Sequence, residues 1–204
     1  MSFTFKSRLE EEKYWSKRYN EGETNWDIGF PSPPLVAYID QLVNTNLRIL
    51  IPGCGNAYEA HYLLEKGFRN VTLLDISSKL MNDLNDYYAE HTNKPKLVNG
   101  DYFLHQGKYD LILEQTFFCS LDPARREEFA EKTAYLLNPG GKYAGLFFNR
   151  TFEQEGPPFG GCKEEYEKLF SPHFHINTLE EAYNSIKPRR GTELFFIFKK
   201  KDQE

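Results

Sequence analysis

The sequence predicts an α/β fold, a doubly wound sheet of seven strands that is mostly parallel and has an antiparallel last strand. Strand-like and helix-like runs alternate through most of the 204 residues, which favours a parallel sheet with helices on both faces. Near the carboxyl end, the runs 173–179 and 192–200 are both strand-like, and a loop containing proline and glycine joins them. This arrangement is typical of an antiparallel pair.

Local signals define the other elements in chain order. Charged residues with spaced aromatic side chains predict a helix over 7–20, and the Gly- and Pro-rich segment 22–34 predicts a loop. Gly67 ends one expected helix, and Asp122 with Pro123 begins another. The expected helices after the loop are 35–43, 57–66, 77–90, 122–137 and 163–170. The expected strands between them are 47–51, 70–76, 96–102, 109–115 and 142–149, with a turn at 138–141.

The most informative stretch is a Gly-Cys-Gly turn, 53–55, which follows the first apolar strand. The second apolar strand ends in Asp75. In an open parallel sheet such a turn lets the backbone approach a ligand closely, and a carboxylate about 20 residues further on can accept hydrogen bonds from two ribose hydroxyls. The pair therefore predicts a cofactor that contains a nucleoside.

Tyr58 helps to decide which nucleoside is bound. Dinucleotide-binding turns carry a third glycine at this position, where the helix start faces a pyrophosphate. A tyrosine side chain would crowd that place, whereas a cofactor without phosphates needs only the first close turn. S-adenosylmethionine therefore fits this sequence better than NAD.

Composition excludes several classes of function. A formal net charge of −5 and a pI near 5.6 argue against a nucleic-acid partner, which usually meets a basic face. The three cysteines are widely spaced and form no Cys-x-x-Cys pair, so we expect neither a disulfide framework nor a metal site. No stretch approaches the ~20 apolar residues of a membrane span. We expect a cytoplasmic protein of one domain, residues 1–204, that acts on a small molecule.

Several motifs, in the same order, resemble the thiopurine, thiol and halide methyltransferase family of the class I S-adenosylmethionine-dependent methyltransferases. The most specific are the Gly-Cys-Gly turn after Pro52 and the Gly-Pro-Pro-Phe segment 156–159. The others are Trp15 with Tyr19, 24–29, 74–77, 100–103 and 115–123. The resemblance covers nearly the whole chain. It implies direct in-line methyl transfer to a small soft nucleophile, such as a thiol, a thiopurine, hydrosulfide or a halide.

The resemblance also implies that residues 1–34 form an N-terminal helix and an aromatic lid over the cofactor, with Trp15, Tyr19 and Trp26 around it. Aromatic faces attract cations, and the cofactor's sulfonium is one. The alternative is that Trp15 and Tyr19 are only the apolar face of a surface helix. Trp26 lies in a Gly-rich loop, where no periodicity explains it.

The remaining cofactor contacts are expected where strands end. Asp75 would bind the ribose, and Gly53 would approach the methionine part through its backbone. Asp101 and Tyr102 fall where the family binds adenine, although they would also suit an ordinary strand end. Glu114 ends a strand, and ligands gather at the carboxyl ends of parallel strands, which places this acid near the methionine ammonium.

The acceptor is expected in an apolar pocket lined by Phe117, Phe118 and Phe159. The first two would equally suit the core. Methyl transfer from a sulfonium mainly requires alignment and removal of water, but a thiol with a pKa near 8.5 is only partly ionised at neutral pH. Candidates that would assist it are Glu114 acting through water, Arg189 and Arg190 as cations, and Arg126, which would equally suit a surface ion pair.

Three other functions are compatible with parts of the sequence. A small-molecule N- or O-methyltransferase is possible because the fold does not fix the acceptor. A nicotinamide-dependent short-chain dehydrogenase is disfavoured, since the third glycine is missing and neither Tyr109, Tyr135 nor Tyr143 has a lysine four residues further on. The third alternative is a module that binds the cofactor without catalysis.

Overall fold

A computed structural model describes residues 4–202. The predicted domain of residues 1–204 includes 1–3 and 203–204, which lie outside the described residues. The strands are β1 (Ile49–Pro52), β2 (Val71–Asp75), β3 (Lys96–Asn99), β4 (Tyr109–Gln115), β5 (Leu137–Phe148), β6 (Phe174–Glu181) and β7 (Glu193–Lys200).

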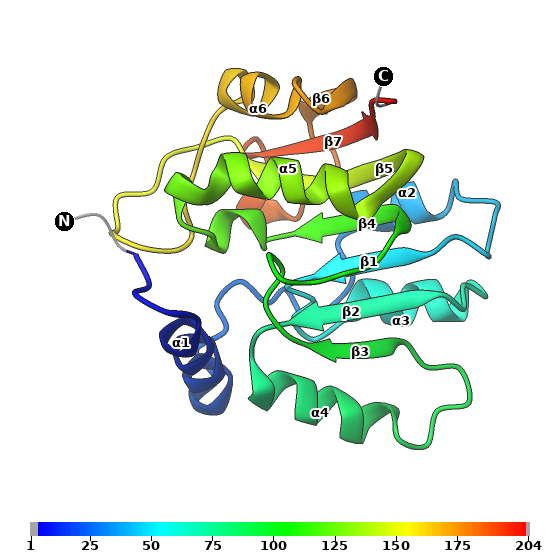
Figure 1. Cartoon of the computed structure of the whole chain (residues 1–204). Coiled ribbons are helices and arrows are strands. Elements are labelled where there is room, and N and C mark those ends of the chain that lie inside the picture. The colour runs from blue at the N-terminus through cyan, green and yellow to red at the C-terminus, as the bar shows by residue number, and fades with distance from the viewer. Residues whose placement is uncertain (1–3, 203–204) are drawn as a thin grey trace.

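These strands form one seven-stranded sheet in the order β3-β2-β1-β4-β5-β7-β6 (Figure 1). Strands β1 to β5 pair in parallel, and β7 runs antiparallel to both β5 and β6. The predicted α/β fold with an antiparallel last strand is therefore confirmed. The chain reverses its direction along the sheet between β1 and β4, and ligands bind at such a switch point in open α/β sheets.

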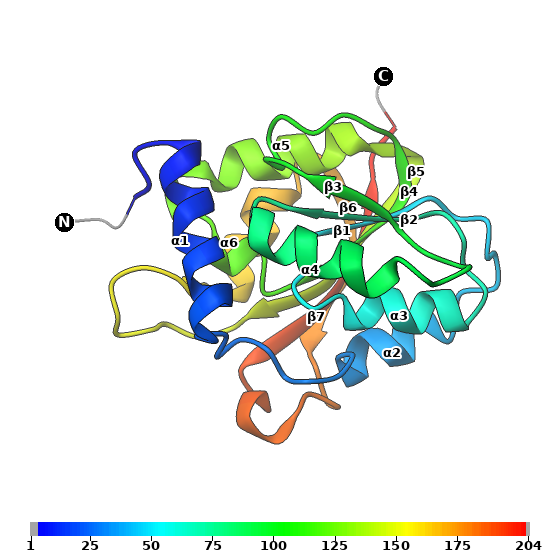
Figure 2. The same ribbon diagram turned by 90° about the horizontal axis from the view of Figure 1, so that it is seen from below.

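Helices cover both faces of the sheet (Figure 2). They are α1 (Arg8–Glu21), α2 (Pro33–Ile39), α3 (Tyr58–Glu65), α4 (Ser78–Tyr88), α5 (Arg126–Leu136) and α6 (Lys163–Phe170), with short 3-10 helices η1 (Phe118–Ser120), η2 (Pro123–Arg125) and η3 (Lys187–Arg189). One apolar cluster packs α5 and α6 on the sheet, and a second packs α2, α3 and α4. Leu50 belongs to the first, whereas Ile49 and Ile51 belong to the second, because neighbouring strand residues face opposite sides.

Several predicted boundaries differ from the structure; the helix expected over 35–43, for example, spans Pro33–Ile39. Two of the differences have a clear cause in backbone hydrogen bonding. The strand expected over 96–102 ends at Asn99, because Asp101 accepts a hydrogen bond from the Phe103 amide at 2.8 Å and closes a turn. The turn expected at 138–141 lies within β5 and does not precede it. Leu137 already pairs with Tyr109, and a bulge absorbs the irregularity.

The first helix, α1, lies at the carboxyl ends of the parallel strands, on the side to which the arrowheads of β1 to β4 point (Figure 1). The Ser7 hydroxyl caps it by accepting a hydrogen bond from the Glu10 amide at 3.2 Å. None of the residues in α1 is buried, and its Tyr19 is only partly buried where it packs against the second apolar cluster. Among residues 4–202, no helix is both long and apolar enough to cross a membrane.

Candidate active site

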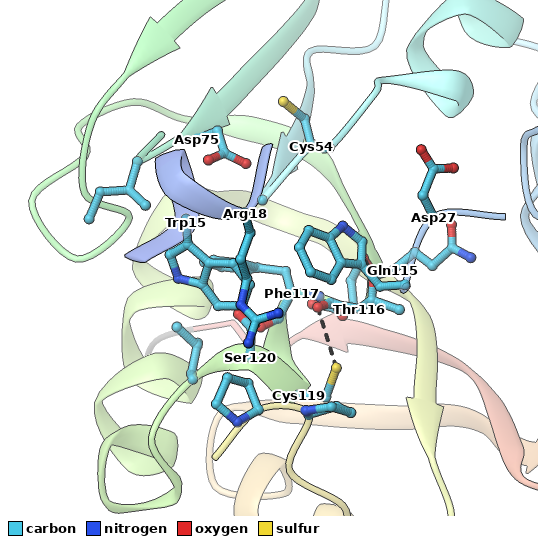
Figure 3. Close-up of a pocket in the computed structure, with 18 of the residues that line it drawn as sticks. Trp15, Arg18, Asp27, Cys54, Asp75, Gln115, Thr116, Phe117, Cys119 and Ser120 are labelled. Atoms are coloured by element: carbon cyan, nitrogen blue, oxygen red, sulfur yellow. Dashed lines mark hydrogen bonds between the residues drawn. The ribbon is translucent and has the colours of Figure 1, made fainter. Parts of the chain in front are cut away.

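A cavity of about 690 Å³ opens beneath α1 and the loop that follows it, at the ends of the parallel strands (Figure 3). Its volume falls in the usual range of small-molecule sites, about 300 to 1,000 Å³. Most of the predicted site residues line it, namely Trp15, Tyr19, Trp26, Gly53, Asp75, Asp101, Tyr102, Glu114, Phe117 and Arg189. The predicted residues that do not line it are Phe118, Phe159, Arg126 and Arg190.

Gly53 forms the floor of the cavity directly after β1. Its φ of 55° lies in the left-handed region, which favours glycine. A Cβ at this position would lie 2.7 Å from Phe117 Cγ, too close for a real contact. The turn therefore needs glycine for two reasons, its conformation and the ring packed against it.

Asp75 ends β2 and points into the cavity (Figure 3). Its side chain is 8% exposed, and Oδ1 accepts a hydrogen bond from the Ser77 amide at 2.9 Å. Burial raises the pKa of Asp75 to about 6, although hydrogen bonds from the Ser77, Gly55 and Ile76 backbone oppose the shift. Ser77, not Asp75, caps α4, so the carboxylate is available to a ligand's hydroxyl groups.

Three carboxylates come together at this end of the cavity. Asp75 ends β2, Asp101 follows the neighbouring strand β3, and Glu11 reaches the cavity from α1. Burial raises the pKa of Glu11, and the charges of Asp101 and Asp75 raise it further against the opposing charge of Arg125. Glu11 is not among the site residues predicted from the sequence. Its position four residues before Trp15 was the available signal, because such residues share one helix face.

Tyr102 lines the cavity, but the core engages much of its side chain. Its hydroxyl is 2.7 Å from the Thr133 hydroxyl. Its ring stacks on Phe129 with centroids 5.1 Å apart. One face of the Tyr102 ring is therefore occupied by Phe129, and the predicted packing on adenine could use only the other face or the ring edge.

The aromatic side chains of α1 line the cavity and are partly buried. Trp26 meets Trp15 and Tyr19 edge to face, with centroids 5.5 Å and 5.8 Å apart. Burial raises the pKa of the Tyr19 hydroxyl. These three rings, which we call the aromatic lid, form one cluster over the cavity.

Polar contacts dock α1 on the start of α4. The Glu12 carboxylate accepts hydrogen bonds from the Ser16 and Ser78 hydroxyls, each at 2.7 Å. The Ser16 hydroxyl is in turn 2.9 Å from that of Ser77. The hydrogen bonds from Ser78 and Ser16 lower the pKa of Glu12. Because Ser77 follows Asp75 by two residues, the docking point of the lid adjoins the ribose acid.

Glu114 lies near the end of β4, next to the last residue, Gln115, and is 1% exposed. It accepts hydrogen bonds from the Phe117 amide at 3.1 Å and the Phe118 amide at 3.0 Å, and from the Tyr143 hydroxyl at 3.4 Å. Burial raises its pKa to about 8 against these hydrogen bonds. The same contacts hold a tight turn in which Thr116 has a φ of 59°, a strained conformation for a β-branched residue.

The family model described as thiopurine S-methyltransferase matches residues 10–201. The chain belongs to the thiopurine S-methyltransferase family. A probable thiol methyltransferase 2 of Arabidopsis thaliana is 31% identical and covers 91% of this chain and 84% of its own length. Thiocyanate methyltransferase 1 of the same plant is 30% identical, covering 97% of this chain and 88% of its own length.

The fold agrees with this family membership. A Burkholderia thailandensis 1,6-didemethyltoxoflavin-N1-methyltransferase, solved with S-adenosylhomocysteine bound, superposes with a TM-score of 0.77 at 17% identity. The match covers 99% of this chain and 94% of the other. The chain is an S-adenosylmethionine-dependent methyltransferase of the class I fold. Its site fits this cofactor, because a buried acceptor, Asp75, and an aromatic cluster for a cation line one cavity.

Two residues predicted to line the acceptor pocket, Phe118 and Phe159, do not line the cavity. Phe118 is buried in the core, where its ring meets those of Phe129 and Phe147 at 5.2 Å and 4.9 Å. Phe159 does not line the cavity, and its amide donates to the Cys119 carbonyl at 2.6 Å. Apolar residues that do line this region are Phe117, Phe148, Phe152, Pro157 and Pro158.

The predicted arginines separate into three positions. Arg126 lies outside the cavity and donates to the Gly160 carbonyl at 2.7 Å, with its guanidinium 4.8 Å from the Phe118 ring centre. Arg190 is exposed and also outside. Arg189 lines the cavity. Of these three arginines, Arg189 is therefore the one whose position would let it contact a ligand in this cavity.

Proposed function

We propose that this methyltransferase acts on a small soft nucleophile, such as a thiol, a thiopurine, hydrosulfide, thiocyanate or a halide. The apolar lining of the cavity next to β5 carries the proposal. In the sheet, β1 and β4 lie between β5 and β2, the strand that ends in Asp75. The five phenylalanines and prolines named above line this acceptor end. Burying a hard anion without a partner costs several kcal/mol, whereas a soft, weakly hydrated nucleophile loses little.

We propose the following contacts with the cofactor. Asp75 accepts hydrogen bonds from the ribose hydroxyls, and Asp101 lies near the adenine. Gly53 approaches the methionine part through its backbone, and Glu114 lies near its ammonium group. Support comes from the shared cavity that all four residues line. Residues 1–34 form a segment over the cofactor, and the aromatic lid of Trp15, Tyr19 and Trp26 within it offers ring faces and edges to the sulfonium.

S-adenosylmethionine supplies an activated methyl group, so the chain's own residues need only to align the acceptor and exclude water. Phe117 and the other side chains of the acceptor end align the acceptor and exclude water by packing around it. A thiol must lose its proton to react well. Glu114, with a pKa of about 8, is a proton acceptor of matched strength when one water molecule joins it to the thiol.

We also propose that the enzyme works in the cytoplasm. Its cysteines Cys54, Cys119 and Cys162 are all free. Reducing compartments keep thiols in this state.

The test is turnover at saturating cofactor with two thiols of different acidity, hydrosulfide, an amine and a catechol. We expect methylation of the sulfur compounds. The rate should climb with pH toward the pKa of each thiol, and the more acidic thiol should reach its plateau at a lower pH. Turnover of the amine or the catechol alone would contradict the proposal and leave the fold and the cofactor site unaffected.

A further inference from the structure

We propose that Arg189 is a positioning residue that latches the aromatic lid in place, and that it is not a free cation for the acceptor. The inference rests on the proposed lid over the cofactor. It does not depend on which acceptor is methylated.

Both arms of the guanidinium are engaged. Nη2 of Arg189 donates a hydrogen bond to the Trp26 carbonyl at 2.7 Å, and Nη1 lies 3.3 Å from Glu193 Oε1. The side chains of Arg189 and Glu193 are only 11% and 4% exposed. The carboxylate of Glu193 therefore balances the positive charge of Arg189. Nη2 is engaged by the Trp26 carbonyl, in the loop that follows α1.

The base of this latch is fixed to the sheet. Glu193 begins β7 and pairs with Phe148 of β5. The Ser185 hydroxyl donates to Glu193 Oε2 at 2.7 Å, so a separate contact holds the other carboxylate oxygen. The Thr192 hydroxyl and amide donate to the Arg189 carbonyl at 2.9 Å and 3.0 Å. Arg189 therefore reaches toward the lid from a rigid position.

The lid itself has few other ties on this side. Its helix, α1, buries none of its residues and docks through Glu12 at the opposite end of the cavity. In the loop, Asp27 accepts hydrogen bonds from the Asn56 and Tyr58 side chains. Arg189 supplies the direct contact from the carboxyl-terminal part of the chain to Trp26. Holding the Trp26 carbonyl places the indole against Trp15 and Tyr19, because the side chain moves with its backbone.

The sequence offers a direct readout of this arrangement, because its two tryptophans, Trp15 and Trp26, both belong to the aromatic lid. Fluorescence excited selectively from tryptophan, and its quenching by acrylamide, therefore report the packing and solvent access of the lid. Binding of S-adenosylmethionine and S-adenosylhomocysteine is measured by calorimetry on the same proteins. No methyl acceptor is present, so failure of the latch and failure of the S-methylation proposal are distinguishable.

The variants are Arg189→Lys, which keeps a charge beside Glu193 but cannot reach both partners, and the double variant Arg189→Gln with Glu193→Gln, which leaves no buried charge unpaired. The matched control is Arg190→Gln, at the exposed arginine next in the chain. Thermal unfolding checks that each variant folds. The double variant keeps the test decisive if the lysine distorts the site.

We expect both Arg189 variants to be quenched about twofold more strongly in the S-adenosylhomocysteine complex, and to bind S-adenosylmethionine about tenfold more weakly, as loss of one charge-assisted hydrogen bond predicts. Arg190→Gln should match the wild type. Folded Arg189 variants with wild-type quenching and affinity would overturn the inference. So would equal changes in Arg190→Gln.

Discussion

The ring of Phe117 packs directly on the backbone of Gly53, so closely that a Cβ at position 53 would meet the ring. Gly53 follows β1 and Phe117 follows β4, and these strands are neighbours in the sheet. Glu114 fixes the Phe117 amide at 3.1 Å. The close contact therefore joins the two turns where the proposed methionine site and the acceptor end meet.

Gly53→Ala should abolish this fit. The new methyl group would displace Phe117, and the left-handed backbone would cost about 1 kcal/mol or more. We expect cofactor affinity to fall by at least about tenfold, measured by calorimetry with S-adenosylhomocysteine. The matched control is Gly67→Ala, which has a φ of 89° but no atom within 4 Å of the added Cβ. It should lower the unfolding temperature without affecting cofactor binding. Wild-type cofactor affinity in Gly53→Ala would show that the cofactor does not bind against Gly53.

Asp75→Ala should weaken cofactor binding by more than about tenfold with the fold intact, because charge-assisted hydrogen bonds contribute about 1.5 to 3 kcal/mol. Calorimetry on the folded variant measures the change. Asp83→Ala, at an exposed acid on α4 paired with Lys79, serves as the control and should bind normally. Unchanged binding in Asp75→Ala would place the ribose elsewhere.

Cofactor affinity should also depend on pH through Asp75. Its pKa of about 6 means that the carboxylate, which accepts from ribose hydroxyls, is lost as pH falls below that value. Wild-type affinity should therefore weaken between pH 7 and pH 5, whereas Asp75→Asn should bind weakly with a flat profile over the same range. Parallel profiles for the two proteins would assign the titration to another group.

Trp26→Ala should weaken the binding of S-adenosylmethionine more than that of S-adenosylhomocysteine. Only the former carries a cation, which an aromatic ring attracts by about 0.5 to 2 kcal/mol. The informative quantity is the ratio of the two dissociation constants. Equal losses for both ligands would reduce Trp26 to a packing residue. Tyr87→Ala, at an exposed ring on α4 away from the cavity, should change neither constant.

Burial of Glu114 should make the stability of the protein fall with rising pH. Its pKa is raised from 4.5 to about 8, so the native state holds the proton more tightly than the unfolded chain. The free energy of unfolding should therefore decline for the wild type relative to Glu114→Gln between pH 4.5 and 8. Denaturant titrations at several pH values measure the difference. The control is Glu90→Gln, at an exposed position, whose free energy of unfolding should change with pH as that of the wild type does. If Glu114→Gln also showed the pH dependence of the wild type, burial would not raise the pKa of Glu114.

Much of the fold could be predicted because local signals coincide with the elements. The predicted ranges of β4 and α6 agree with Tyr109–Gln115 and Lys163–Phe170, since both are bounded by polar or Gly-rich segments. The end of β3 and the start of β5 could not be predicted. An Asx turn at Asp101 and a bulge opposite Tyr109 decide them, and both depend on hydrogen bonds that a pattern of apolar residues does not contain.

The candidate site was predictable where one residue sits at a strand end, as for Asp75 and Glu114. It was not predictable where neighbouring side chains diverge. Phe117 and Phe118 are adjacent, yet the 3-10 turn sends one to the cavity and the other to the core. Tyr102 is held by Thr133, 31 residues away. Such partners are fixed by tertiary packing, which a single sequence does not reveal.

The proposed preference for sulfur is tested most directly by an acceptor that carries two competing nucleophiles. With 2-aminothiophenol or 4-mercaptophenol at saturating S-adenosylmethionine, the products are identified by mass spectrometry and NMR. An apolar acceptor end at Phe117, Phe148 and Phe152 predicts that the methyl group is found on sulfur in both. Methylation of the amine or the phenol oxygen in place of sulfur would contradict the S-methyltransferase assignment.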